Sequence, residues 1–129
     1  MPILLEKNFQ SSFCKWIKVK KIPGLFELKI SHGNTVAFSK FEFQQLPSLF
    51  KCYSEGLYHK ESDFGGISLK PADCWFMHGP AYVVIIFNIP KNQKEFYIIH
   101  IKEVMRIKNS GAKSITKKDC EKMGFKNSF

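Results

Sequence analysis

One run of the sequence limits the possible folds more than any other. Residues 81–87, Ala-Tyr-Val-Val-Ile-Ile-Phe, are apolar or aromatic at every position. A strand with one face in water alternates apolar and polar residues, whereas an uninterrupted apolar run is typical of a strand covered on both faces. We therefore expect this run at the centre of a sheet that carries other layers on both sides. It is too short to cross a bilayer as a helix, which takes about 20 residues.

Three shorter segments predict further strands. Residues 95–101 combine aromatic and β-branched side chains, which predicts a strand antiparallel to 81–87. Residues 74–77 precede the His-Gly-Pro sequence at 78–80, a turn signal that predicts a hairpin with 81–87. Residues 57–60 follow a Glu-Gly turn and predict a short strand.

Helical periodicity predicts the first helix, over residues 6–18. Phe9 and Phe13 belong to an apolar stripe that recurs at helical spacing. The opposite side of this helix carries Lys15 and Lys18. That side either borders a nucleic-acid groove or is an ordinary solvated helix face.

Capping sequences predict where two other helices begin. Ser39 is followed three residues later by Glu42, and Thr116 is followed three residues later by Asp119, so both fit a capping box. Pro47 then kinks or restarts the helix that Ser39 begins. Helices are expected over residues 6–18, 39–50, 103–108 and 116–124. The predicted fold class is α/β, with a central mixed β-sheet flanked by helices in one domain, residues 1–129.

A second run, residues 26–30, places two opposite charges among apolar residues. Because side chains alternate along a strand, Phe26 and Leu28 share one face while Glu27 and Lys29 share the other. A carboxylate beside an ammonium on one strand face is suited to metal and phosphate chemistry. The alternative is a half-exposed strand whose two charges are simply solvated.

Charge and cysteine usage narrow the class of partner. The chain has 20 Lys and Arg against 11 Asp and Glu, a formal net charge of +9, which suits a polyanionic partner such as nucleic acid or an anionic membrane surface. Arg106 is the only arginine, so we expect contacts to the phosphate backbone rather than reading of bases. The four cysteines are far apart, without the spacing of a zinc site, and we interpret them as reduced thiols of a cytoplasmic protein.

In its short motifs the chain resembles the PD-(D/E)XK nuclease superfamily, in particular the small Holliday junction resolvase-like proteins of phage and metagenomic genomes. The matching motifs are Phe26-Glu27-Leu28-Lys29, Ala37-Phe38-Ser39, Gln44-Gln45-Leu46, Lys70-Pro71-Ala72-Asp73-Cys74-Trp75 and Ala81-Tyr82-Val83-Val84. The motif order departs from the superfamily, because here Glu27 and Lys29 precede Asp73. Either this branch is rearranged, or Asp73 is not a metal ligand.

The resemblance implies a restriction-endonuclease-like fold and a Mg²⁺-dependent endonuclease, with Mn²⁺ as a possible substitute, acting on branched DNA as a homodimer. Glu27 and Asp73 would hold the metal, with Asp63 as the reserve acid, and Lys29 and Gln45 would complete the catalytic set. Positive charge for the DNA backbone would come from Lys15, Lys18, Lys20, Lys21, Lys40, Lys60 and Lys70.

Two other functions fit the same sequence. A DNA-binding module with the same basic face but no working metal site would follow if Asp73 points into the core. An RNA-binding or virion-associated structural protein would rest on the charge and the aromatic content alone.

Overall fold

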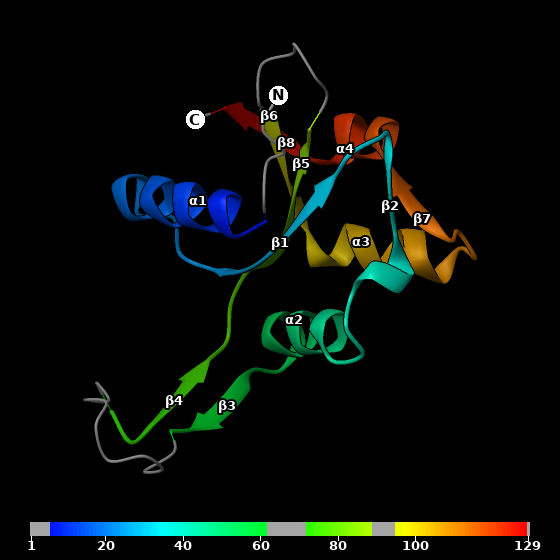
Figure 1. Cartoon of the computed structure of the whole chain (residues 1–129). Helices are drawn as coiled ribbons and strands as arrows, with labels where there is room; N and C mark the ends of the chain where they lie inside the picture. Colours follow the sequence, from blue (N-terminus) through cyan, green and yellow to red (C-terminus); the bar gives the residue numbers. More distant parts are fainter. Residues whose placement is uncertain (1–5, 62–71, 89–94, 129) are drawn as a thin grey trace.

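The computed structural model describes residues 6–61, 72–88 and 95–128 (Figure 1). Its central feature is a mixed four-stranded sheet in the order β1-β5-β6-β8. The strands are β1 (Leu25–Ser31), β5 (Ala81–Phe87), β6 (Glu95–His100) and β8 (Phe125–Ser128). β1 runs parallel to β5, while the β5–β6 and β6–β8 pairs are antiparallel. The mixed sheet, the internal position of β5 and the antiparallel β6 confirm the expectations from the sequence.

Helix α1 (Glu6–Lys20) covers one face of this sheet. Phe9 and Phe13 of α1 are fully or almost fully buried against Val84 and Ile86 of β5 and Phe96 of β6. Burying a phenylalanine side chain contributes about 1.5–3 kcal/mol relative to leaving it exposed, so these two rings fix the helix to the sheet. The predicted apolar stripe is therefore the packing face of α1.

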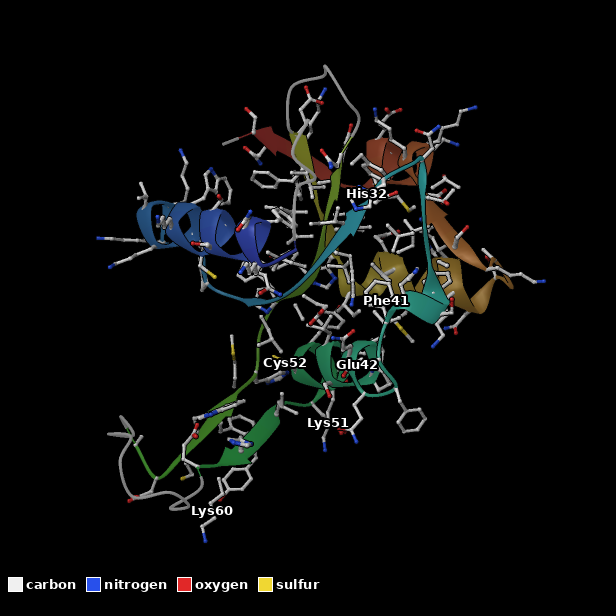
Figure 2. The ribbon with its side chains drawn as sticks, in the orientation of Figure 1. His32, Phe41, Glu42, Lys51, Cys52 and Lys60 are labelled. Atoms are coloured by element: carbon white, nitrogen blue, oxygen red, sulfur yellow. The ribbon has the colours of Figure 1, made fainter. Side chains whose placement is uncertain are left out.

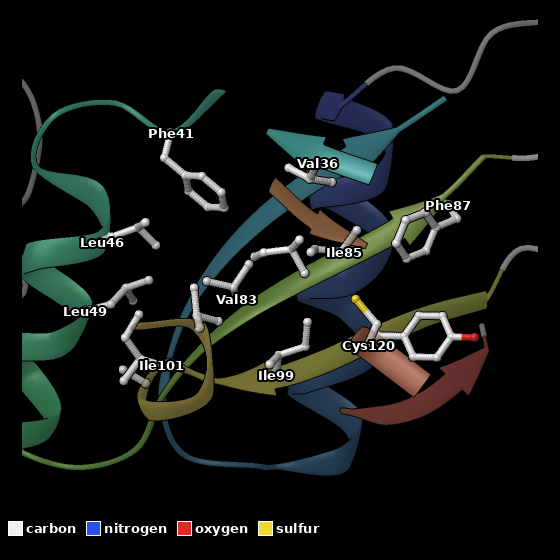
Figure 3. Close-up of a cluster of buried hydrophobic side chains, with 14 of the residues drawn as sticks. Val36, Phe41, Leu46, Leu49, Val83, Ile85, Phe87, Ile99, Ile101 and Cys120 are labelled. Carbon is white, nitrogen blue, oxygen red and sulfur yellow. The ribbon is translucent and has the colours of Figure 1, made fainter. Parts of the chain in front are cut away.

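Three helices cover the other face. They are α2 (Gln45–Ser54), α3 (Ile101–Asn109) and α4 (Lys117–Met123). Leu46 and Leu49 of α2 point toward Val83 and Ile101, as Figure 3 shows, and Cys120 of α4 lies in the same buried cluster. β5 is buried on both faces, which explains why its sequence is apolar without interruption, as predicted.

Two short ribbons lie outside the main sheet. β2 (Thr35–Ala37) pairs with β7 (Ser114–Thr116), and β3 (Leu57–Lys60) pairs with β4 (Cys74–Met77), both antiparallel. The β3–β4 ribbon extends away from the four-stranded sheet (Figure 1).

The prediction of a hairpin between residues 74–77 and 81–87 is wrong. The turn between these strands carries the chain from the β3–β4 ribbon to the four-stranded sheet. The N–H of Gly79 donates to the carbonyl of Cys52, and the carbonyl of Pro80 accepts from the N–H of Leu25. Both bonds tie the turn to other elements, so β4 and β5 do not pair with each other.

The helix expected over residues 39–50 begins six residues later than predicted from Ser39. Residues Phe38–Lys40 form the short 3₁₀ helix η1 without a side-chain cap, and α2 starts at Gln45. Pro47 therefore lies in the first turn of α2, where backbone N–H groups have no partner within the helix and a proline costs little. It marks the start of the helix rather than a kink.

The two predicted helices near the C-terminal end are confirmed. α3 spans the expected segment, and Thr116 caps α4 with the reciprocal bonds of a capping box to Asp119, ending at Gly124. Within the part of the chain that the structure describes, no helix combines the length and the hydropathy needed to cross a membrane.

Candidate functional site

Strand β1 presents its apolar and charged side chains on opposite faces, as alternation predicts. Phe26, Leu28 and Ile30 belong to the cluster beneath α1. On the other face Lys29 Nζ lies 3.6 Å from Glu27 Oε1, with the Lys29 side chain 13% exposed and that of Glu27 26% exposed. This ion pair lies on the edge strand of the sheet, and both of its side chains are half-buried rather than fully solvated.

The ring of Phe41 fixes the position of the Lys29 ammonium. Lys29 Nζ lies 5.2 Å from the centre of the Phe41 ring, within the range of a cation–π interaction. Phe41 is itself buried in the cluster between α2 and the sheet. Because water is partly excluded, the ammonium interacts more strongly with a nearby anion than an exposed lysine does.

An open cavity of about 280 Å³ lies beside Glu27, between β1 and the start of α2. Its lining comes from β1, from the segment before α2 and from the first turns of α2: Leu25, Phe26, Glu27, Glu42, Gln44, Gln45, Ser48 and Leu49. Glu27 and Gln45, which the sequence analysis proposed for one site, therefore line the same cavity.

The geometry of Gln45 follows from the way α2 begins. Its side-chain Oε1 accepts a hydrogen bond from the backbone N–H of Glu42 at 2.9 Å, and its backbone N–H donates to the Glu42 carbonyl at 3.1 Å. These bonds close the turn that leads into α2 and hold Gln45 beside the cavity. The amide nitrogen of Gln45 is then the group that can donate toward a bound anion.

Glu42 is a candidate that the sequence analysis missed. Its spacing from Ser39 suggested a capping role, but Ser39 caps no helix and the Glu42 side chain lines the cavity beside Glu27. Figure 2 shows Phe41 and Glu42 on the segment that leads into α2. The adjacency of Glu42 to Gln44-Gln45 is the signal that could have suggested it.

Asp73 does not take the position expected for a second ligand beside Glu27. It precedes β4, which pairs with β3 in a separate sheet and not with β1. Its carbonyl accepts from the N–H of Glu61 at the end of the ribbon farthest from the turn that leads into β5. Among the described residues, the cavity beside Glu27 has no lining residue from β4. Asp63 and Lys70 lie outside the described residues.

The described lysines among those expected to bind DNA are exposed but come from separate parts of the fold. Lys15, Lys18 and Lys20 lie on α1, and Lys21 follows it. Lys40 ends η1, which packs on the opposite side of the sheet, and Lys60 ends β3. The positive charge is therefore distributed around the molecule rather than gathered at the Glu27 cavity.

The cysteines do not contribute to this cavity. Burial raises the pKa of the Cys120 thiol to about 12, and Cys52 is buried as well, whereas Cys14 and Cys74 are exposed. A buried thiol with so high a pKa is almost never a thiolate at neutral pH, so Cys120 is a packing residue.

No match was found when the chain was compared with models of protein families, with curated proteins and with solved structures.

The groups that line the cavity have the chemistry of a Mg²⁺ site. Mg²⁺ prefers oxygen ligands and often takes only one or two carboxylates from the protein, with water and phosphate oxygens completing its shell. Glu27 and Glu42 are the two acidic residues among those that line the cavity, and Ser48 is a hydroxyl residue among them. Within the described residues, no group of three or more His, Cys, Asp or Glu side chains is placed to hold a metal, so two carboxylates are the most that this cavity offers.

Proposed function

We propose that this protein is a metal-dependent, structure-selective DNA endonuclease that resembles Holliday junction resolvases and hydrolyses phosphodiester bonds in branched DNA. One observation carries the proposal: Glu27, which is paired with the largely buried Lys29 ammonium, lines a cavity that Glu42 and Gln45 also line. An anchored cation beside carboxylates suits a substrate that is itself a phosphate anion. The net charge of +9 favours a nucleic acid as the source of that phosphate.

In this proposal Glu27 and Glu42, rather than Glu27 and Asp73, hold a Mg²⁺ or Mn²⁺ ion. When bound, such an ion activates water and neutralises charge on the phosphate. Lys29, fixed by Phe41, binds an oxygen of the scissile phosphate and stabilises the charge that grows on it. Gln45 donates its amide N–H groups to the same phosphate or to the attacking water.

The test is a cleavage assay on four-way-junction, nicked, linear and single-stranded DNA with Mg²⁺ or Mn²⁺. Glu27→Gln, Lys29→Gln and Glu42→Gln should each lower the cleavage rate at least about a hundredfold, because each removes a charge at the reacting phosphate. Affinity for the junction measured without metal should change little, since many lysines contribute to it.

Two further variants make the test specific to the cavity. Asp73→Asn should cleave at the wild-type rate, because Asp73 directly precedes β4, which belongs to a different sheet from the β1 strand of Glu27. Glu55→Gln, at an exposed acid after α2, is the matched control for the loss of one carboxylate. Normal cleavage by Glu27→Gln and Lys29→Gln would disprove the nuclease proposal. Loss of cleavage in Asp73→Asn but not in Glu42→Gln would show that Asp73, and not Glu42, belongs to the metal site.

The second candidate is a basic DNA-binding module without catalysis. It is favoured by the small number of carboxylates around Glu27 in the described part of the chain. This function predicts that the wild-type protein binds DNA and cuts none of the four substrates at any concentration of Mg²⁺ or Mn²⁺.

A further inference from the structure

The β3–β4 ribbon has two faces with different contents. The pairing places Tyr58 opposite Phe76 and Lys60 opposite Cys74, so these four side chains share one face. Leu57, His59 and Trp75 lie on the opposite face, which we call the second face. We call the first the Tyr58–Phe76 face.

The side chains of the second face contact the core or one another. Leu57 and Met77 pack against the core cluster beneath the sheet. Farther along the ribbon, the Trp75 indole N–H donates to Glu61 Oε1 at 2.8 Å, and the His59 ring lies 5.3 Å from the Trp75 ring. His59 Nε2 also lies 3.9 Å from Glu61 Oε2. This network orients Trp75 within the ribbon and leaves it 37% exposed, less than Tyr58 or Phe76.

The Tyr58–Phe76 face is exposed. Tyr58 is 63% and Phe76 65% exposed, although cross-strand aromatic pairs usually help to bury each other. The Phe76 ring nevertheless packs closely over Gly56, because a Cβ at Gly56 would lie 2.3 Å from Phe76 Cζ. Gly56 also has a φ of +106°, which favours glycine. An aromatic ring thus packs against the backbone of Gly56 on one side and is open to solvent on the other.

Two lysines lie on or near this face. Lys60 lies on the same face as Tyr58, and Lys51 belongs to the last turn of α2, where its carbonyl accepts from the N–H of Gly56 (Figure 2). Positive charge beside exposed aromatic rings is the combination that binds single-stranded nucleic acid, because phosphates follow the lysines while bases stack on the rings. A stable protein interface needs about 800 Å² from each partner, which is more than two rings of about 150–250 Å² supply.

We propose that the Tyr58–Phe76 face binds unpaired bases of a nucleic-acid strand by stacking, with Lys60 contacting the backbone. Stacking on a ring requires neither Glu27 nor a metal ion, so this binding site is independent of the proposed cleavage site. In a branched DNA, the face would hold nucleotides that have left the duplex.

The test compares two fluorescent oligonucleotides of about 15 nucleotides, one of dT and one abasic, which have the same phosphates but differ in bases. Anisotropy is measured in EDTA, so that cleavage plays no part. Wild-type protein should bind the dT strand at least about tenfold more tightly than the abasic strand. Tyr58→Leu/Phe76→Leu keeps apolar volume but removes both rings, and it should bind the two strands with equal affinity.

Phe125→Leu is the matched control, because Phe125 is 70% exposed on β8, away from the ribbon, and should leave the preference for dT unchanged. Tyr58→Leu alone preserves the contact between Phe76 and Gly56 and serves if the double variant does not fold. The dependence of affinity on salt should be the same for wild type and variant, since no phosphate contact is lost. Equal binding of dT and abasic strands by the wild type, or an undiminished dT preference in the Tyr58 and Phe76 variants, would overturn the proposal.

Discussion

His100 shows how one residue between a strand and a helix can make the stability of the fold depend on pH. Its Nδ1 accepts a hydrogen bond from the N–H of Lys102 at 3.0 Å and thereby caps α3. The Tyr53 and Tyr82 rings pack edge-on against it. Burial first, and the nearby Lys102 ammonium second, lower the pKa of His100 from its ordinary value of 6.5, against the opposing effect of Glu103.

The sign of the effect follows from this shift. Between the lowered pKa of the folded protein and the ordinary pKa of 6.5, the histidine is mostly protonated in the unfolded chain and mostly neutral in the folded one, so the unfolded state binds more protons. The free energy of unfolding should therefore fall as the pH drops from about 7.5 to about 5.5. His100→Asn keeps an acceptor for the cap without a titrating ring, and chemical denaturation should show a smaller fall. An equal fall in both proteins would contradict the role of His100.

Single-residue predictions succeeded where they depended on local geometry. Alternation along one strand was enough to place Glu27 and Lys29 together, because the period of a strand is two. Glu42 was misread, since its place depends on where α2 begins, which Pro47 and Gln45 decide. The position of Asp73 could not be derived, because it depends on which strand β4 pairs with.

At the scale of elements, two similar capping sequences form different local structures. Ser39 with Glu42 and Thr116 with Asp119 both fit a capping box, but only Thr116 makes the reciprocal bonds. Thr116 Oγ1 accepts from the Asp119 N–H at 3.1 Å, and Asp119 Oδ2 accepts from the Thr116 N–H at 3.0 Å. The segment after Ser39 forms one 3₁₀ turn instead, whose first residue Phe38 donates its N–H to the Lys113 carbonyl.

This difference predicts unequal costs of truncation. Thr116→Ala should lower the free energy of unfolding by about 1 kcal/mol, since it leaves a helix N–H without its acceptor. Ser39→Ala, the matched control, should change it by less than about 0.5 kcal/mol, as expected for an exposed residue with no capping bond. Urea denaturation measures both. Similar losses for the two variants would show that the cap at Thr116 does not stabilise α4.

The elements that were predicted correctly are those with their own periodicity or caps. α1, α3, α4, β5 and β6 needed no knowledge of distant partners. The three-residue strands β2 and β7 were missed, because they are too short to show alternation and exist only through pairing with each other. The Gly79-Pro80 turn marked a change of direction, but a turn signal is local and does not tell which sheet the next strand joins.

At the scale of the whole molecule, we expect binding to duplex DNA to depend on the distribution of positive charge more than on any one lysine. Because the exposed lysines of α1, η1 and β3 lie on different parts of the surface, no single substitution should abolish binding to duplex DNA. A footprint of about five phosphates gives a slope near −4.5 in a plot of log affinity against log salt concentration, nearly independent of sequence.

Titration of duplex binding over a range of salt concentrations measures this slope. Replacing one contacting lysine, such as Lys18, by alanine should make the slope less steep by about 0.9. A weak salt dependence together with strong sequence preference would contradict binding through the phosphate backbone.

The parallel pairing of β1 with β5 also determines what a nascent chain presents to the cell. β1 ends at Ser31 and β5 begins at Ala81, and synthesis at about 5–20 residues per second separates the two by several seconds. During that time Phe26, Leu28 and Ile30 have been made, but β5, which completes their cluster, has not. The apolar face of the strand that carries Glu27 and Lys29 therefore has no cover from β5 until the chain has been extended by some fifty residues.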